Sequence, residues 1–271
     1  MTKRKALTIA GSDTSGGAGI QADLKTFQEL GVYGMNALTV IVAQDPANAW
    51  HHAVFPIEAE LVGKQIDTVL DGIGVDAMKT GMLPTVEIIE TIASKIKASG
   101  VKNVVIDPVM VCKGADEVLN PDTAIALRDL LAPLATVITP NVFEAGQLSE
   151  LGKTPTNLDE MKLAAARIHE KGAQYVLVKG GSKIEGTTAV DVLYDGNEFI
   201  LIEDERIDTP YTHGAGCTYS SAITAELAKG ASVEDAVRSA KKFITAAIRN
   251  SFKLNEYVGP TDHSAHRTVN S

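Results

Sequence analysis

A short glycine-rich segment near the end of the chain has the residue types of a site for negative charge. In THGAGCTYS, residues 212–220, Gly214 and Gly216 permit a tight backbone arc just before a predicted helix. Backbone N–H groups there converge with the helix dipole, which favours charge that develops on a transferring phosphoryl group. Cys217 lies at the same helix start, where thiol pKa values fall, so a thiolate could accept a substrate proton. The alternative is that Cys217 is only a small residue packed between a helix and a strand.

Three charged residues follow predicted strands. Asp107 comes after VVI, Glu144 lies in ITPNVFEA, and Lys179 ends the strand in VLVKGG. Open α/β sheets bind ligands at the carboxyl ends of their strands, so these side chains are expected at one edge. Asp107 and Glu144 would hold Mg²⁺ mostly through water, and Lys179 would neutralise nucleotide phosphates. Helix capping is the alternative role for lone polar residues at such positions.

A second glycine-rich loop, AGSDTSGGAGIQAD at residues 10–23, follows a strand and opens a helix. Its glycines permit close approach of a ligand to backbone N–H groups, and Asp23 is expected to face the mouth of the loop. Gly17, Gly19 and Ala22 also fit the dinucleotide pattern of an oxidoreductase, although the turn before them is long for that motif. A plain turn with Asp13 or Ser15 as helix cap is the third alternative.

Two further patterns predict no site. The segment Gly152-Lys153-Thr154 resembles the end of a phosphate-binding loop, but the leading glycine is one residue out of place and no strand precedes it. The pair His51-His52 lies in a polar stretch without a third ligand at metal spacing, which predicts solvated histidines in a loop.

The elements that position these residues alternate between β-branched runs and helical periods, which is typical of βαβ units around a mostly parallel sheet. Strands are expected at residues 6–10, 37–43, 77–79, 104–107, 136–139 and 175–179. Helices are expected at 85–97, from Asn157 to before Gly172, at 221–228 and at 233–252. Residues 189–203, around Asp195-Gly196, predict an antiparallel ribbon at the sheet edge. We expect one domain over residues 1–271, with a mobile tail after about residue 258.

Composition narrows the function classes. The chain has 271 residues, is 45% hydrophobic and carries a formal charge of −9. That fraction can bury a core, and the acidic balance disfavours sequence-independent binding to nucleic acid. No apolar stretch approaches the ~20 residues of a membrane helix, and the first residues lack a signal-peptide core. Cys112 and Cys217 form no CxxC pair. We therefore expect a cytoplasmic protein with reduced thiols and small-molecule partners.

Together, AGSDTSGGAGIQADLKTF, MKTGML, VVIDPVMVCKG, ITPNVFEA, VLVKGG and THGAGCTYSSAI resemble the ribokinase-like kinases of vitamin metabolism along nearly the whole chain. The resemblance is to the branch that contains hydroxymethylpyrimidine and phosphomethylpyrimidine kinase and similar pyridoxal kinases. It implies a three-layer α/β/α sandwich, a homodimer with residues 189–203 as a possible interface, and ATP- and Mg²⁺-dependent phosphorylation of a hydroxymethyl group, or of its phosphate, on a heterocycle.

The resemblance also implies roles by position. The groups around the heterocycle would be Gly11, Ala18, Asp23, Gln44, Met82 and Val109. The nucleotide would meet Asn141, Lys179, Thr212 and His213, with Asp107 and Glu144 in the magnesium region. The backbone of Gly214-Ala215-Gly216 resembles the anion hole of the family, and Cys217 stands where most sugar-kinase relatives have a catalytic aspartate.

Two residues bear on the choice of heterocycle. Gln44 resembles the pyrimidine kinases, because an amide can donate to and accept from an aminopyrimidine. Cys112 resembles the pyridoxal kinases, in which a lid thiol adds to the aldehyde, and the lid is expected at residues 113–117. A mixed specificity follows: hydroxymethylpyrimidine, its monophosphate, and pyridoxal or pyridoxine. The alternatives are a dedicated pyridoxal kinase and a vitamin-binding protein without catalysis.

Overall fold

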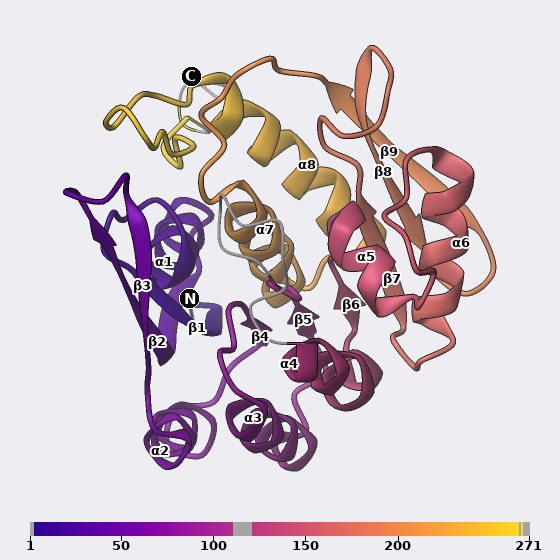
Figure 1. Cartoon of the computed structure of the whole chain (residues 1–271). Helices are drawn as coiled ribbons and strands as arrows, with labels where there is room; N and C mark the ends of the chain where they lie inside the picture. The colour runs from indigo at the N-terminus through magenta and orange to yellow at the C-terminus, as the bar shows by residue number, and fades with distance from the viewer. Residues whose placement is uncertain (1–2, 111–120, 266, 268–271) are drawn as a thin grey trace.

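The computed structural model describes residues 3–110, 121–265 and 267, and the strands within these ranges form one sheet (Figure 1). The order along the sheet is β3-β2-β1-β4-β5-β6-β7-β8-β9. The strands are β1 (Lys5–Asp13), β2 (Tyr33–Asp45), β3 (His51–Pro56), β4 (Ala77–Thr80), β5 (Val104–Ile106), β6 (Val137–Ile138), β7 (Tyr175–Lys179), β8 (Thr188–Tyr194) and β9 (Phe199–Glu205). Pairing from β2 through β7 is parallel, whereas β3, β8 and β9 pair antiparallel. All six strands expected from the sequence are present, with small shifts at their ends.

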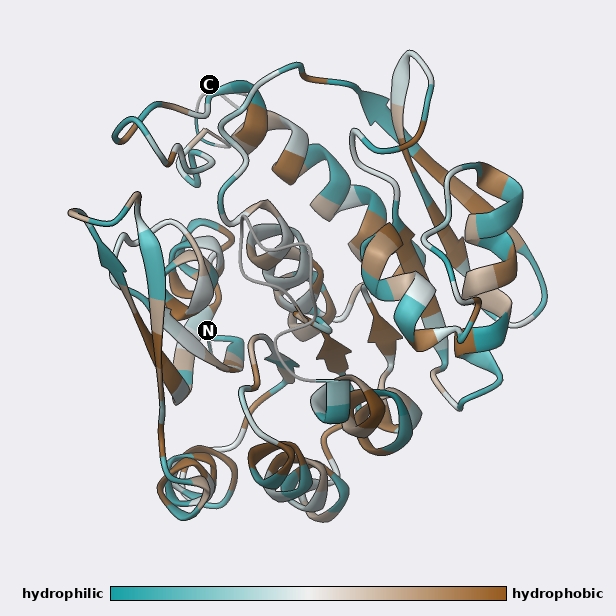
Figure 2. Ribbon diagram, in the orientation of Figure 1, coloured by the Kyte–Doolittle hydropathy of each residue, from teal (hydrophilic) through white to brown (hydrophobic). Residues whose placement is uncertain are grey.

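Helices cover both faces of the sheet (Figure 1). One apolar layer is built on α2 (Ala59–Leu70), α3 (Val86–Ser99), α4 (Pro121–Ala126), the π-helical turn Leu127–Leu131, the short 3₁₀ turn Ala132–Leu134, α5 (Val142–Leu148) and α6 (Leu158–His169). The other is built on α1 (Gly19–Glu29), α7 (Ala215–Lys229) and α8 (Val233–Arg249). Between the layers the short strands β5 and β6 are hydrophobic (Figure 2), as expected for parallel strands buried on both faces. The three-layer α/β/α sandwich is confirmed.

The helix and turn signals of the sequence are also present. Thr85 caps α3 by accepting from the amide of Ile88 at 3.2 Å, and Gly100 ends that helix with a left-handed φ of 67°. Asn157 caps α6 in the same way. In the β8–β9 ribbon, Gly196 adopts φ 95°, a conformation that glycine reaches without strain. Helix α8 ends at Arg249, three residues before the predicted end.

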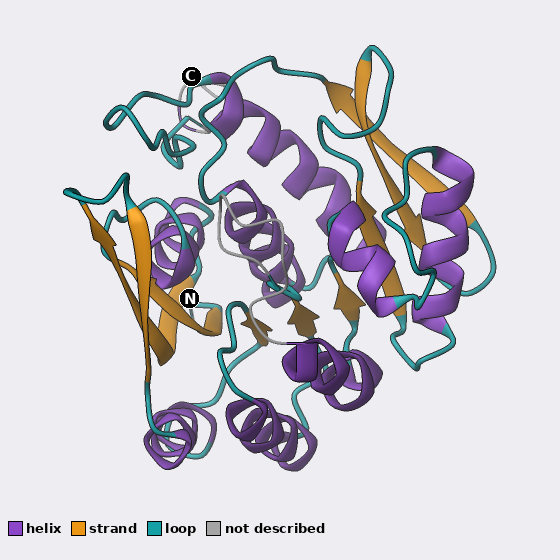
Figure 3. Cartoon of the chain, viewed as in Figure 1, coloured by secondary structure: helices purple, strands orange, loops and turns teal. Residues whose placement is uncertain are grey.

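The edge of the sheet at β3 was not predicted. Residues 51–56, expected to begin as a polar loop, pair antiparallel with β2, so that His52 lies opposite Gln44 (Figure 3). Polar and apolar residues do not alternate clearly in this segment, because an edge strand pairs with a neighbouring strand on one side only. At the opposite edge, the β8–β9 ribbon confirms the prediction.

Residues 258–265, where the sequence predicts a mobile tail, pack against the rest of the fold. Val258, Thr261, His263 and Ala265 are buried. The amide of His213 donates to the carbonyl of Gly259 at 3.1 Å, and the amide of Thr261 donates to the carbonyl of His213 at 3.2 Å. A polar composition concealed this packing, because the segment is held by backbone pairing and not by an apolar stripe. In the described part of the chain, no helix is long and apolar enough to cross a bilayer.

Burial of His263 predicts a pH-dependent stability. Its Nε2 lies 3.0 Å from the hydroxyl of Thr218, and burial lowers its pKa from 6.5 to about 4. The unfolded chain therefore binds this proton more readily than the folded one, so acid destabilises the fold between pH 6.5 and about pH 4. Relative to His263→Gln, which does not titrate, the wild type should lose up to about 3 kcal/mol of unfolding free energy over that window.

Urea unfolding from pH 4 to 7.5 measures this difference. His51→Gln, which replaces an exposed histidine, is the matched control. Its unfolding free energy should change with pH in parallel with that of the wild type. If the unfolding free energies of His263→Gln and the wild type change in parallel with pH, the lowered pKa of His263 is contradicted.

Candidate active site

A cavity of about 320 Å³ lies at the carboxyl ends of the parallel strands, within the range of small-molecule sites. Most of the residues proposed from the sequence line it: Gly11, Ala18, Gln44, Met82, Asp107, Val109, Asn141, Glu144, Lys179, Thr212, His213, Gly214, Ala215, Gly216 and Cys217. The structure thus brings together both glycine-rich loops and the strand ends. Cys112 and the lid expected at residues 113–117 lie outside the described residues. Another cavity of about 430 Å³, lined by residues 74–76 and 99–103 among others, contains none of these side chains.

The two glycine-rich loops interlock. Gly214 precedes α7 with a left-handed φ of 77°, and a Cβ atom at this position would lie 1.8 Å from the carbonyl oxygen of Gly17. Only glycine permits that approach. A Cβ atom at Gly216 would lie 3.5 Å from the ammonium of Lys179, so the first turn of α7 faces a cation. The amides at the start of α7 therefore form a concave, positive site suited to a phosphoryl group.

Asp107 anchors the strand-end part of the cavity. Its Oδ1 accepts from Lys179 Nζ at 3.2 Å and from the hydroxyl of Thr139 at 3.2 Å, and its Oδ2 accepts from Ser220 at 3.0 Å. Burial opposes the charge of Asp107, but the ammonium groups of Lys179 and Lys79 outweigh it and hold its pKa below the usual value. Burial likewise opposes the charge of Lys179, and the nearby carboxylates keep its pKa raised. The pair is therefore ionised.

Glu144 lies one helical turn into α5. Its Oε2 accepts from the amide of Asn141 at 2.8 Å, while Asn141 Oδ1 accepts from the amide of Glu144 at 3.0 Å. This reciprocal capping box fixes both side chains at the cavity. Burial raises the pKa of Glu144 to about 7, with Lys179 opposing the shift. Capping, the alternative role considered for these residues, thus coexists with a position at the cavity.

The donor set fits a magnesium ion held through water. Asp107 and Glu144 are hard oxygen ligands at one cavity wall, and Mg²⁺ commonly binds through one or two carboxylates, water and substrate phosphates. The described residues contain no cluster of three or more His, Cys, Asp or Glu side chains suited to direct coordination.

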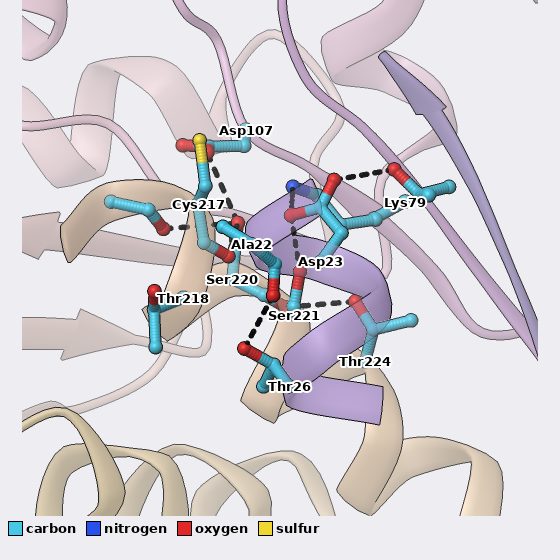
Figure 4. Close-up of polar contacts among 12 residues, drawn as sticks. Ala22, Asp23, Thr26, Lys79, Asp107, Cys217, Thr218, Ser220, Ser221 and Thr224 are labelled. Carbon is cyan, nitrogen blue, oxygen red and sulfur yellow. Dashed lines mark hydrogen bonds and ion pairs between the residues drawn. The ribbon is translucent and has the colours of Figure 1, made fainter. Parts of the chain in front are cut away.

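The expectation of a thiolate at Cys217 is wrong for the ligand-free protein. Burial raises the pKa of the thiol to about 12, and the carboxylates of Asp23 and Asp107 add to that shift. Lys79 and the amide of Gly19 oppose it without reversing it. The helix start alone predicts a lowered pKa, but desolvation outweighs the helix start here. The half-buried side chain still lines the cavity and points toward Asp107 (Figure 4).

The expectation that Asp23 faces the cavity is also wrong. Its carboxylate is fully buried, pairs with Lys79 Nζ at 2.9 Å and accepts from the hydroxyls of Thr8 and Ser221, each at 2.6 Å (Figure 4). It does not line the cavity. Position in α1 directs Asp23 toward the sheet, and the buried ammonium of Lys79 supplies the partner that a buried carboxylate requires.

Two ionisable residues of the cavity lining were missed. Asp13 was considered only as a helix cap, and His52 only as a solvated loop residue, yet both line the cavity. Asp13 is 7% exposed, and its Oδ2 lies 2.7 Å from His213 Nε2. Burial opposes its charge, but the hydrogen bond and charge of His213 hold its pKa well below the usual range. The sequence signal for Asp13 was its place a few residues beyond a predicted strand, similar to the signal that identified Asp107.

The other sequence patterns have structural explanations. A Cβ atom at Gly19 would lie 2.3 Å from the carbonyl oxygen of Gly11, and one at Gly17 would lie 2.6 Å from the ring of His213. These glycines pack against the protein itself, so the oxidoreductase alternative loses its dinucleotide loop. Lys153 pairs with Glu160 at the surface, as expected of a turn.

A three-layer sandwich with a glycine-rich helix start and a lysine–carboxylate pair at the carboxyl edge of its sheet is the arrangement of a ribokinase-like fold. The relatives of this chain are named kinases, which makes it a phosphotransferase. The model of the family described as phosphomethylpyrimidine kinase matches residues 13–262. The chain therefore belongs to the phosphomethylpyrimidine kinase family.

Two relatives from Bacillus subtilis span nearly the whole chain. Pyridoxine kinase is 67% identical over 98% of this chain and 98% of its own length. Hydroxymethylpyrimidine/phosphomethylpyrimidine kinase is 44% identical over 98% and 97%.

Solved structures agree with these relatives. An ADP complex of Bacillus subtilis pyridoxal kinase has a TM-score of 0.95 at 66% identity, covering 98% of this chain and 99% of that one. The pyridoxal kinase of Staphylococcus aureus with AMP-PCP and pyridoxal has a TM-score of 0.93 at 49% identity, covering 99% and 96%. The ribokinase-like fold is confirmed.

Removing the charge of Asp23 should affect stability and not substrate choice. Asp23→Asn leaves the ammonium of Lys79 buried without an ionic partner, which typically costs about 3–5 kcal/mol. Chemical denaturation measures the loss. Asp67→Asn is the matched control, because its pair with Lys95 is about one-third exposed on both sides and should contribute under ~1 kcal/mol. A stable Asp23→Asn variant with a raised KM for the heterocycle would restore the substrate role.

Proposed function

We propose that this phosphotransferase transfers the γ-phosphoryl group of ATP to the hydroxymethyl group of pyridoxal or pyridoxine, and also to hydroxymethylpyrimidine and its monophosphate. One observation carries the proposal: Gln44 and residues 214–217, the proposed anion hole, line the same cavity. A heterocycle and a nucleotide terminus can therefore meet there, which is the geometric requirement for direct transfer.

The choice of heterocycle rests on the relatives. The higher identity, 67%, is to a pyridoxine kinase, and the lower, 44%, is to a hydroxymethylpyrimidine/phosphomethylpyrimidine kinase. Gln44 supports use of the aminopyrimidine because its amide offers both a donor and an acceptor. A dedicated pyridoxal kinase with little pyrimidine activity is the second candidate, and the difference in identity favours it.

In the proposed mechanism, the ring lies against Gly11, Ala18, Gln44, Met82 and Val109. Asn141, Lys179, Thr212 and His213 lie on the nucleotide side. The hydroxymethyl oxygen attacks the γ-phosphorus in line while the bond to the leaving oxygen of ADP breaks. The amides of residues 214–217 stabilise the equatorial oxygens, and Lys179 offsets nucleotide charge.

Asp107 and Glu144 would hold Mg²⁺ through water. When bound, that ion supplies charge neutralisation for the nucleotide phosphates. Asp107 stays ionised through its pair with Lys179, so it can accept hydrogen bonds from metal-bound water. Glu144 gains this ability as the pH rises through about 7, where its carboxyl ionises.

Cys217 is proposed as the base only in the complex with both substrates, because the free protein holds its thiol protonated. Cys217→Ala should lower kcat by about 10²–10⁴-fold, the range of a positioned acid or base, with little change in KM. The wild-type kcat should also rise with pH above neutrality, because ionisation of a high-pKa thiol is required. Steady-state kinetics from pH 6 to 10 measure both effects. Unchanged turnover in Cys217→Ala would remove the base and leave the anion hole intact.

The proposed activity is tested by ATP turnover with Mg²⁺, offering hydroxymethylpyrimidine, its monophosphate and pyridoxal separately at matched concentrations. Phosphorylation of all three supports the dual activity. Turnover of pyridoxal alone supports the dedicated kinase, and turnover of the pyrimidines alone contradicts the vitamin B6 assignment. Binding of heterocycle without turnover of any would overturn the proposal.

We also propose a homodimer in the cytoplasm. Exposed apolar side chains support an interface at either edge of the sheet: Ile41 and Phe55 on β2 and β3, or Phe199 and Leu201 on the ribbon predicted from the sequence. Phe55→Glu and Phe199→Glu each place a charge on one candidate face, and one of the two should yield a monomer by light scattering. A monomeric wild type contradicts the dimer.

A further inference from the structure

Asp13, at the end of β1, is the most heavily hydrogen-bonded side chain of the cavity wall. Its Oδ1 accepts from Gln44 Nε2 at 2.7 Å and from the amide of Ser15 at 2.9 Å. Its Oδ2 accepts from the amide of Ala18 at 2.8 Å and lies 2.7 Å from His213 Nε2. The hydroxyl of Ser15 lies within hydrogen-bond distance of both oxygens. One carboxylate therefore joins three segments: the β1–α1 loop, strand β2 and the loop before α7.

The Oδ1 contact fixes the side-chain amide of Gln44. An ionised carboxylate only accepts hydrogen bonds, so the nitrogen of Gln44, and not its oxygen, must face Asp13. The carbonyl oxygen and the second N–H of Gln44 then remain for other partners. Gln44 lines the cavity, so Asp13 determines which hydrogen-bonding pattern this wall can present to a heterocycle.

The Oδ2 contact fixes the loop that carries the anion hole. His213 directly precedes Gly214. Its ring packs against Gly17, where a Cβ atom would lie 2.6 Å from the ring. The backbone of His213 is held by Gly259 and Thr261. With its ring on Asp13 and its backbone on residues 259–261, His213 has little freedom, and Gly214 follows it.

We propose that Asp13 is a positioning residue that couples the heterocycle wall to the anion hole, orienting the amide of Gln44 through one carboxylate oxygen and holding His213, and hence Gly214, through the other. This inference rests on the proposed function, since it assigns both ends of the coupling to the same transfer reaction. Asp13 itself needs no contact with substrate for this role.

Asp13→Asn is the direct test, because asparagine keeps the shape but has only one oxygen. Its NH₂ group must face a backbone N–H, that of Ser15 at the Oδ1 position or that of Ala18 at the Oδ2 position. One backbone contact is therefore lost, and either Gln44 or His213 must change its hydrogen-bonding role. A small displacement of reacting groups lowers rates about 10²-fold. We expect kcat for the preferred heterocycle to fall about 10- to 100-fold, or the ratio of kcat/KM values for pyridoxal and hydroxymethylpyrimidine to shift by at least about tenfold.

Single and double variants separate the contact of Asp13 with Gln44 from its contact with His213. His213→Asn should lower kcat without moving the substrate ratio, and Gln44→Met should move the ratio with a smaller change in kcat. Adding Asp13→Asn to either should produce less than the product of the separate effects, because the residues act through shared contacts. Fully multiplicative effects in both cycles would overturn the coupling.

Hydrogen exchange measured by mass spectrometry gives a readout that needs no turnover. Amides of residues 213–217 should exchange faster in Asp13→Asn and in His213→Asn than in the wild type. Asp76→Asn is the matched control: Asp76 accepts from the amide of Lys5 and from Arg4, each at 2.8 Å, and is not part of this cavity. It should leave exchange at residues 213–217 and the substrate ratio unchanged.

The two hypotheses fail in different ways. If the wild type phosphorylates none of the three heterocycles, the proposed function is wrong, and exchange at residues 213–217 still decides whether Asp13 holds that loop. If turnover is normal and Asp13→Asn lowers only the melting temperature, with unchanged exchange, kcat and substrate ratio, Asp13 is merely structural and the inference is overturned.

Discussion

The ion pair between Asp23 and Lys79 is the constraint on which the site depends. Both side chains are fully buried at 2.9 Å, and hydroxyls of Thr8 and Ser221 complete the shell of Asp23. These residues come from α1, β4, β1 and α7, so the four elements must meet at one point (Figure 4). A buried charge without its partner is strongly destabilising, and the register of α7 against the sheet is therefore narrowly set. That register aims the amides at the start of α7 at the strand ends.

The burial that would strengthen the proposed anion hole also keeps the thiol of Cys217 protonated. Backbone dipoles act more strongly where water is excluded, and the first turn of α7 lies above the buried pair. In that environment the thiol of Cys217 stays protonated, whereas the lysine–carboxylate pair of Lys179 and Asp107 stays ionised because its charges compensate each other. In the proposed mechanism, electrostatic stabilisation is therefore in place before the substrates bind, and proton removal by Cys217 follows their binding. That order suits a loose phosphoryl transfer, in which positioning and charge stabilisation dominate.

Local patterns in the sequence predicted what local physics decides. The period of residues 85–97, the cap at Asn157 and the turn at Gly196 follow from their own neighbours, and the strand ends located Asp107 and Lys179. Asp23 could not be assigned from the sequence, because its orientation depends on Lys79, 56 residues away. The same holds for Asp13, whose partner His213 is 200 residues distant. For Cys217 the local rule predicted a lowered pKa, and burial by distant segments reversed it.

In the proposed function, different parts of the cavity serve the choice of heterocycle and the transfer chemistry. Gln44 and His52 lie on β2 and β3, at one edge of the sheet, whereas Lys179 and the anion hole lie on β7 and at the start of α7. Residues at the β2–β3 edge can change without moving the buried pair or the strand ends. Relatives named for a pyridoxine and for a pyrimidine substrate, at 67% and 44% identity to this chain, fit such a division. Under this division, a change of substrate specificity needs few substitutions, provided that Asp13 still links the β2–β3 side of the cavity to the start of α7.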